Sequence, residues 1–318
     1  MLDVRVTAPH ALAEEVSARL AADPTVANLA HLRGVAHDGA GDVLMFELAR
    51  ENADVTVGML RRAGIPQHGS IVVSQTLTVA SDAADAAERA APGHPADGVF
   101  WAQLADQSRE DARWSWSFFT FLLLATLIAG VGRVLDQPIL IIGAMVVGPE
   151  FAAVAALCYG VARRRPRILG GAAATLFGGF AACAAIAWAV WAIVYAAGGI
   201  SFAQATSGPL TEFIIAPDVW SFVIAVLAGI AGVLSLTSSK SAALVGVFIS
   251  ITTVPAVGTI GLTAAVGAWG EARSALVQLA INLAGLLVAG VATLAFQLHA
   301  GPAVARRFPR GKGATARR

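Results

Sequence analysis

Two apolar stretches decide how this chain folds: residues 142–150 read IGAMVVGPE, and residues 245–255 read VGVFISITTVP. Each places glycine and proline inside a hydrophobic segment. Proline removes a backbone donor and clashes with the preceding turn, so both segments are expected to form broken helices. Backbone groups that lose their helical hydrogen bonds at membrane depth must form hydrogen bonds with protein, water or a solute instead. A pair of such breaks in matching places of two halves is the pattern of a transport site.

The charged residues are unevenly distributed along the 318 residues, of which 57% are hydrophobic and 14% charged. From Trp114 to Ala162 the charged residues are Arg133, Asp136 and Glu150. Apolar runs of about 20 residues can cross about 30 Å of hydrocarbon, so we expect a soluble N-terminal part followed by a membrane part. The first residues lack the apolar core of a signal peptide. The net charge of +1 gives no indication of nucleic-acid binding.

The N-terminal part combines strand and helix patterns. Residues 2–7 alternate apolar and polar side chains, which predicts a half-buried strand. The other predicted elements are a helix at 10–22, a hairpin of residues 26–32 and 43–48, a helix at 53–63 and a strand at 71–79. The order β-α-β-β-α-β predicts a cytoplasmic ferredoxin-like domain over residues 1–80, and this fold hosts many functions.

Little in this domain indicates chemistry. A small-molecule regulatory role and an assembly role both fit it. Residues 81–114 are expected to form a linker and an amphipathic helix at the bilayer surface. Because the histidines lack metal-ligand spacing and no phosphate-binding glycine loop is present, we expect no metal, no cofactor and no catalytic residue. These histidines are His10, His31, His37, His68 and His94, and the two cysteines, Cys158 and Cys183, are expected to be core residues.

The second part is predicted to be an α-helical multi-pass transmembrane domain over residues 115–298, followed by a basic cytoplasmic tail at 299–318. Six spans can be placed, at 116–134, 138–161, 168–195, 219–236, 240–265 and 273–297. The two breaks fall in the second and fifth spans. An odd number of spans in each half inverts the second half, which predicts a 3+3 inverted repeat.

Basic residues indicate the orientation of the spans. Short loops rich in lysine and arginine stay cytoplasmic, and the loop between the second and third spans carries Arg163, Arg164, Arg165 and Arg167. Six spans from a cytoplasmic N-terminus also leave the tail at residues 306–318, which is rich in arginine, inside. We therefore expect both termini in the cytoplasm and the chain in a bacterial inner membrane with lipid around it. Small-residue helix faces favour a homo-oligomer.

The stretches at residues 142–160, 241–261 and 281–283 resemble the membrane region of the domain of unknown function 389 family, a group of uncharacterised bacterial membrane proteins. The resemblance covers most of residues 115–297 and implies fold and topology but no established activity. This chain departs from the family's usual pattern in two ways. It has Ala153 and Ala256 where the family commonly has proline, and Glu150 where the family usually has an apolar residue.

Glu150 is the candidate for chemistry because it is the one carboxylate near the middle of a predicted span. Ionisable residues at that depth mark ion or proton sites. A second interpretation is structural, since an acid after Pro149 also caps the positive end of a helix. Hydroxyl and amide groups at comparable depth complete the predicted pathway, whose members are Gly148, Pro149, Glu150, Ser250, Thr252, Thr253, Pro255 and Asn282.

The sequence favours a transporter or channel for an unidentified small solute or ion, with a cytoplasmic regulatory or assembly domain. A non-transporting membrane sensor or scaffold is the alternative, because it would contain the same helices. An intramembrane enzyme is disfavoured, since the spans lack a nucleophile–base pair, a zinc cluster and paired carboxylates. A polar path between the breaks would discriminate transport from the alternative.

Overall fold

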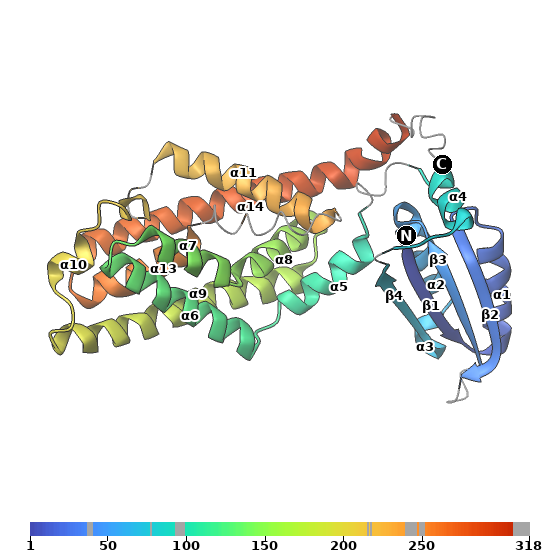
Figure 1. Cartoon of the computed structure of the whole chain (residues 1–318), viewed down its shortest axis with the longest axis horizontal. Coiled ribbons are helices and arrows are strands. Elements are labelled where there is room, and N and C mark those ends of the chain that lie inside the picture. The colour runs from blue at the N-terminus through green and yellow to red at the C-terminus, as the bar shows by residue number, and fades with distance from the viewer. Residues whose placement is uncertain are drawn as a thin grey trace. The chain divides into compact units, whose positions relative to one another are not determined.

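The computed structural model describes residues 1–36, 41–76, 78–92, 99–214, 216, 218–238, 247 and 252–307. Its contacts divide the chain into two compact units. The first, here the N-terminal unit, comprises Met1–Leu104, Thr237–Ser239 and His299–Arg318; the second, the helical unit, comprises Ala105–Leu236 and Lys240–Leu298. The chain is mostly helical, with a small N-terminal sheet (Figure 1).

The sheet of the N-terminal unit has four strands, β1 (Leu2–Ala8), β2 (Val26–Ala36), β3 (Gly41–Leu48) and β4 (Ser70–Gln75). Their order is β2-β3-β1-β4, and all neighbours are antiparallel. The alternation predicted for the first strand is present, because Val4 and Val6 are fully buried whereas Asp3 and Arg5 are exposed. The strand predicted at 71–79 ends at Gln75, which pairs with Leu2, where β1 itself begins.

Helices supply the rest of this unit's core. They are α1 (His10–Ala21), η1 (Arg50–Asn52), α2 (Ala53–Arg62), α3 (Ile65–His68) and α4 (Asp82–Ala90). Val16 and Leu20 of α1 and Val57 and Leu60 of α2 join the inward side chains of β1 and β3 in one buried cluster. A smaller cluster packs Ala84 and Ala87 of α4 with Ala27 of β2. The sheet and helices are therefore held by burial of apolar area, the main favourable contribution to folding.

The helical unit contains the apolar segments. Its elements are α5 (Trp101–Asp111), α6 (Trp116–Val134), α7 (Pro138–Val147), α8 (Glu150–Ala162), α9 (Pro166–Ala196), α10 (Phe202–Thr206), η3 (Glu212–Ile214), α11 (Val219–Thr237), α13 (Thr253–Ala265) and α14 (Trp269–Arg307). The first residues of α5, the last residue of α11 and the last residues of α14 are assigned to the N-terminal unit. Among the described residues, four helices are long and apolar enough to cross a membrane. A fifth span is added if α7 and α8, bent by 53°, count as one. Much of the predicted span at 240–265 lies outside the described residues, which include Val247 and the helix from Thr253.

Glycines bring the helices of this unit close together. A Cβ at Gly258 of α13 would lie 2.5 Å from the Thr126 carbonyl oxygen of α6, and one at Gly229 of α11 would lie 2.8 Å from the Leu286 carbonyl oxygen of α14. Figure 1 shows α11 running along α14. Close backbone approach through small residues is the usual packing of helices in membranes. Large apolar side chains on the outer faces, such as Leu227 and Val288, are more than half exposed, as expected for contact with lipid.

Candidate functional site at the helix break

The predicted break in the second span is present. Helix α7 ends at Val147 and α8 begins at Glu150. The Gly148 amide donates to the Ala144 carbonyl at 3.0 Å, which is the last bond of α7. A continued helix would next bond the Met145 carbonyl to the amide of residue 149, and proline has no N–H to donate. Pro149 therefore ends the hydrogen-bond ladder at this point.

Glu150, the first residue of α8, is 4% exposed. Thr253 Oγ1 donates to Glu150 Oε1 at 2.8 Å. Thr253 is the first residue of α13 and is fully buried. Glu150 and Thr253 are 103 residues apart in sequence, and their hydrogen bond joins the first residues of α8 and α13. Residues 248–251, within the second predicted break, lie outside the described part of the chain.

The second carboxylate oxygen has a different environment. Glu150 Oε2 is buried and has no hydrogen-bond partner among the described residues. It lies against Gly148, where a Cβ would collide with Oε2 and come within 2.9 Å of a methyl group of Val254. Glycine at 148 is therefore what allows the carboxylate to fold back over the break. An unpaired polar oxygen in such a site costs about 1–3 kcal/mol or more, so this arrangement requires an explanation.

Other predicted pathway residues lie beside this contact. Asn282 of α14 donates through Nδ2 to Thr252 Oγ1 at 2.5 Å, directly before α13 begins. Pro255 lies in the first turn of α13, because the helix starts at Thr253. An amide there lacks an intrahelical acceptor in any case, so this proline removes no helical hydrogen bond. Ser250 is outside the described residues.

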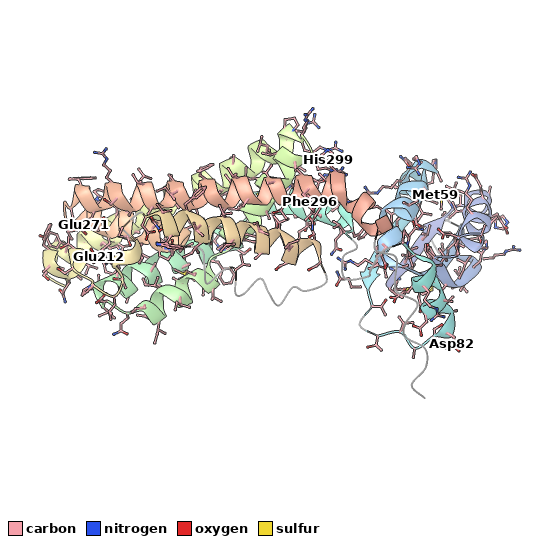
Figure 2. All side chains as sticks on the ribbon, turned by 90° about the horizontal axis from the view of Figure 1, so that it is seen from above. Met59, Asp82, Glu212, Glu271, Phe296 and His299 are labelled. Carbon is pink, nitrogen blue, oxygen red and sulfur yellow. The ribbon has the colours of Figure 1, made fainter. Side chains whose placement is uncertain are left out.

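A second polar cluster occupies one end of the helical unit. Arg133, near the end of α6, is 1% exposed and donates to the carbonyls of Gly208 at 3.1 Å and Thr206 at 3.0 Å. Its third bond goes to Thr211 Oγ1 at 2.9 Å. Glu212 and Glu271 lie at the same end of the unit (Figure 2), and both attract the Arg133 guanidinium. The three hydrogen bonds of Arg133 therefore stabilise the position of the loop between α10 and η3.

Asp136 is also hydrogen-bonded to the loop between α10 and η3. Its carboxylate accepts from the Leu210 and Thr211 amides, the latter at 3.0 Å, and from the Thr211 hydroxyl at 2.9 Å. In the sequence, Arg133 and Asp136 stand out only as rare charges among apolar residues, and no motif predicts a role for them. Their rarity was the available signal, because two of the three charges between Trp114 and Ala162 belong to this cluster.

The N-terminal unit contains a third cluster that sequence spacing did not reveal. Asp42 Oδ2 lies 2.8 Å from His10 Nδ1 and 2.7 Å from His31 Nε2, and Oδ1 accepts from the Gly34 amide at 2.9 Å. These hydrogen bonds, first that of Gly34 and then those of His31 and His10, lower the pKa of Asp42 to about 2. Within the described chain, no group of three His, Cys, Asp or Glu side chains could hold a metal ion.

Three of the predicted topogenic arginines form the turn between α8 and α9, and the fourth, Arg167, lies in the first turn of α9. Arg163 follows the last residue of α8, and α9 begins at Pro166. Arg164 adopts a left-handed conformation with φ of 51°, and its amide donates to the Val161 carbonyl at 3.2 Å. The tight turn therefore places four arginines within five consecutive residues at one end of α8 and α9.

Comparison with known protein families finds a match within the helical unit. Residues 145–288 match the family model described as Domain of unknown function (DUF389). An uncharacterized protein of Methanocaldococcus jannaschii is 28% identical over 171 residues, 54% of this chain and 51% of that protein, so the matched segment spans about half the relative's length. No solved structure matches the chain. This match to the family model confirms the resemblance that was predicted from residues 142–160 and 241–261.

Proposed function

We propose that the protein is a multi-pass membrane transporter or channel for a small solute or ion, and that its pathway passes the break between α7 and α8. The observation that carries this proposal is the buried contact of Glu150 with Thr253, beside a carboxylate oxygen that has no partner among the described residues. Ionisable groups at membrane depth are rare and are kept where they serve a function. Gly148, Pro149, Thr252, Pro255 and Asn282 supply the shape and polar lining of the site.

The proposed architecture is a 3+3 inverted repeat of six spans. It is supported by the bent α7–α8 pair, by an apolar α13 that begins beside it, and by four further helices of spanning length. The N-terminal unit is proposed to be a ferredoxin-like domain, because the strand order β2-β3-β1-β4 with antiparallel neighbours is that of this fold. Its proposed role is regulation by a small molecule or assembly of a homo-oligomer, which a mass measurement in nanodiscs would test.

The proposed orientation places both termini in the cytoplasm of a bacterial cell, with the arginines at 163–167 on the inner side. An impermeant thiol reagent tests this in intact cells. Cysteine introduced by Arg164→Cys or Lys312→Cys should be labelled only after lysis. Labelling of either before lysis would reverse the orientation.

A membrane sensor or scaffold is the second candidate, and one observation favours it: Glu150 is an acid in the first turn of α8, where a carboxylate stabilises the positive end of a helix without any ligand. We propose no enzymatic activity. The discriminating experiment is a screen of solute and ion flux in proteoliposomes with the intact chain, the Glu150→Gln variant and, as a matched control, Glu110→Gln on the exposed surface of α5. Transport predicts a flux that Glu150→Gln changes and Glu110→Gln leaves intact. Absence of flux for every solute would favour the scaffold.

A further inference from the structure

The carboxylate of Glu150 lies where two helices begin. Glu150 is the first residue of α8 and Thr253 is the first residue of α13, and their side chains are hydrogen-bonded. The N-terminus of a helix carries roughly half a positive charge together with amides that lack intrahelical acceptors. Two such ends supply about one positive charge, which is enough to balance one carboxylate.

No cationic side chain contributes to this balance among the described residues. Helices α7, α11 and α13 contain no ionisable side chain. The ionisable groups with described side chains on the other surrounding helices are Arg133 on α6, Cys158 and Tyr159 on α8 itself, Arg167, Cys183 and Tyr195 on α9, and Glu271, Arg273 and His299 on α14. None of them bonds to Glu150, whose electrostatic partners are the Thr253 hydroxyl and its own amide. The positive potential at the site therefore comes from helix ends.

Helix N-termini with free amides are sites for anions. In broken membrane helices they typically face the anionic group of a substrate. A carboxylate of the protein itself occupies that position here. One of its oxygens accepts from Thr253, while the other is buried without a partner, so the carboxylate fills the site without completing its hydrogen bonds.

We propose that the space between the N-termini of α8 and α13 binds one small monovalent anion, and that the Glu150 carboxylate is its tethered competitor. The inference rests on the proposed transport function and names the class of substrate. When Oε2 takes up a proton from water, the side chain becomes neutral and no longer competes for the helix ends, so one anion enters for each proton bound. The charge is limited to one because no lysine or arginine of the described residues adds to the two helix ends.

The size of the anion is limited by the walls of the site. Gly148 leaves room for the carboxylate, but a single added carbon there would collide with it, and Val254 is fully buried beside it. The matching ligands are anions about the size of a carboxylate group, such as nitrate, chloride or acetate. A sodium ion would add positive charge beside two positive helix ends, which the site disfavours.

Binding to the purified full chain in detergent tests the proposal separately from transport. The probes are sodium nitrate, sodium acetate and sodium gluconate at constant ionic strength, and choline nitrate tests whether the cation matters. Affinity for nitrate should rise with acidity, by up to about tenfold for each pH unit if one proton is linked, and gluconate should bind far more weakly. This dependence is measured on the unaltered protein, so it does not require a variant to fold.

Variants locate the site. Glu150→Gln should bind nitrate with the affinity that the unaltered chain reaches in acid, at every pH, whereas Glu110→Gln should keep the original dependence. Thr253→Val should weaken nitrate binding both in the otherwise unaltered chain and in the Glu150→Gln variant. Binding that needs sodium and disappears in Glu150→Gln would overturn the anion site in favour of a cation site. Nitrate binding unaffected by Glu150→Gln, or no nitrate binding at all, would also overturn it.

The two proposals fail in different ways. If nitrate binds as described but no solute crosses the proteoliposome membrane, the transport function is wrong and the anion site stands. If a cation or a neutral solute is transported and nitrate does not bind, the transport function stands and the anion site is wrong.

Discussion

Arg133 and Glu150 are both charged, both almost fully buried and both in the helical unit, yet their surroundings differ. Arg133 donates three hydrogen bonds to one loop and is attracted by three acidic side chains, with only its Nε unpaired. Glu150 has one side-chain donor and an oxygen without a partner in the described part of the chain. The first arrangement is what a structural role requires. The second is incomplete among the residues that the structure describes, as a ligand site would be.

The largest expected effect is on the Arg133 cluster. Arg133→Leu should leave the buried carbonyls of Thr206 and Gly208 without donors and reduce the free energy of unfolding by about 3–5 kcal/mol. Thermal unfolding in mild detergent measures this. Arg273→Leu, on an exposed position of α14, is the matched control and should change stability by less than about 0.5 kcal/mol. If Arg133→Leu and Arg273→Leu reduced the free energy of unfolding equally, Arg133 would have no special structural role, and its contrast with Glu150 would be lost.

Gly148→Ala should produce the next largest effect. The added Cβ meets Glu150 Oε2 and the Val254 methyl group, so we expect a loss of about 1–3 kcal/mol. Gly143→Ala, within α7, is the control, since nothing lies within 4 Å of a Cβ at that position and helix propensity favours alanine by about 1 kcal/mol. In a Glu150→Ala background the cost of Gly148→Ala should fall. If it does not, the carboxylate is not what requires glycine at this position.

Most elements of both units were predictable because they repeat a simple pattern. The alternation in residues 2–7 and the long apolar runs each follow from burial or lipid contact along one element. The rarity of charge singled out Glu150 in the same way. Its bond to Thr253 was not predictable, because the two residues are 103 positions apart and lie on separate helices. The acceptors of Arg133 are backbone carbonyls, which every residue has, so no sequence motif marks them.

The two prolines of the predicted breaks should behave differently. Pro149→Ala supplies an amide that the Met145 carbonyl can accept from, so it should reduce the 53° bend, preserve folding and impair flux. Pro255 lies in the first turn of α13, where Pro255→Ala gains no helical bond and should change stability by less than about 0.5 kcal/mol. Flux assays and thermal unfolding on both variants measure this. A loss of flux that is as large in Pro255→Ala as in Pro149→Ala would show that the break is not what the pathway depends on.

The smallest expected effect concerns Asp42, a buried carboxylate that, like Arg133, has several hydrogen-bond partners. Its pKa falls from 3.8 to about 2 because the folded protein donates hydrogen bonds to the carboxylate, that of Gly34 being the strongest. A depressed folded pKa means that the unfolded chain takes up the proton first. The contribution of Asp42 to stability is therefore complete above the unfolded pKa of 3.8 and is lost as the pH falls through about 2.

Hydrogen exchange of β2 and β3 in the full chain, corrected for intrinsic rates, should show protection that declines across this interval. Asp42→Asn should lower protection at neutral pH and remove the decline, whereas Asp3→Asn, exposed on β1, should do neither. If the decline persists in Asp42→Asn, the acid sensitivity belongs to other carboxylates, and the Asp42 cluster is only a local set of hydrogen bonds.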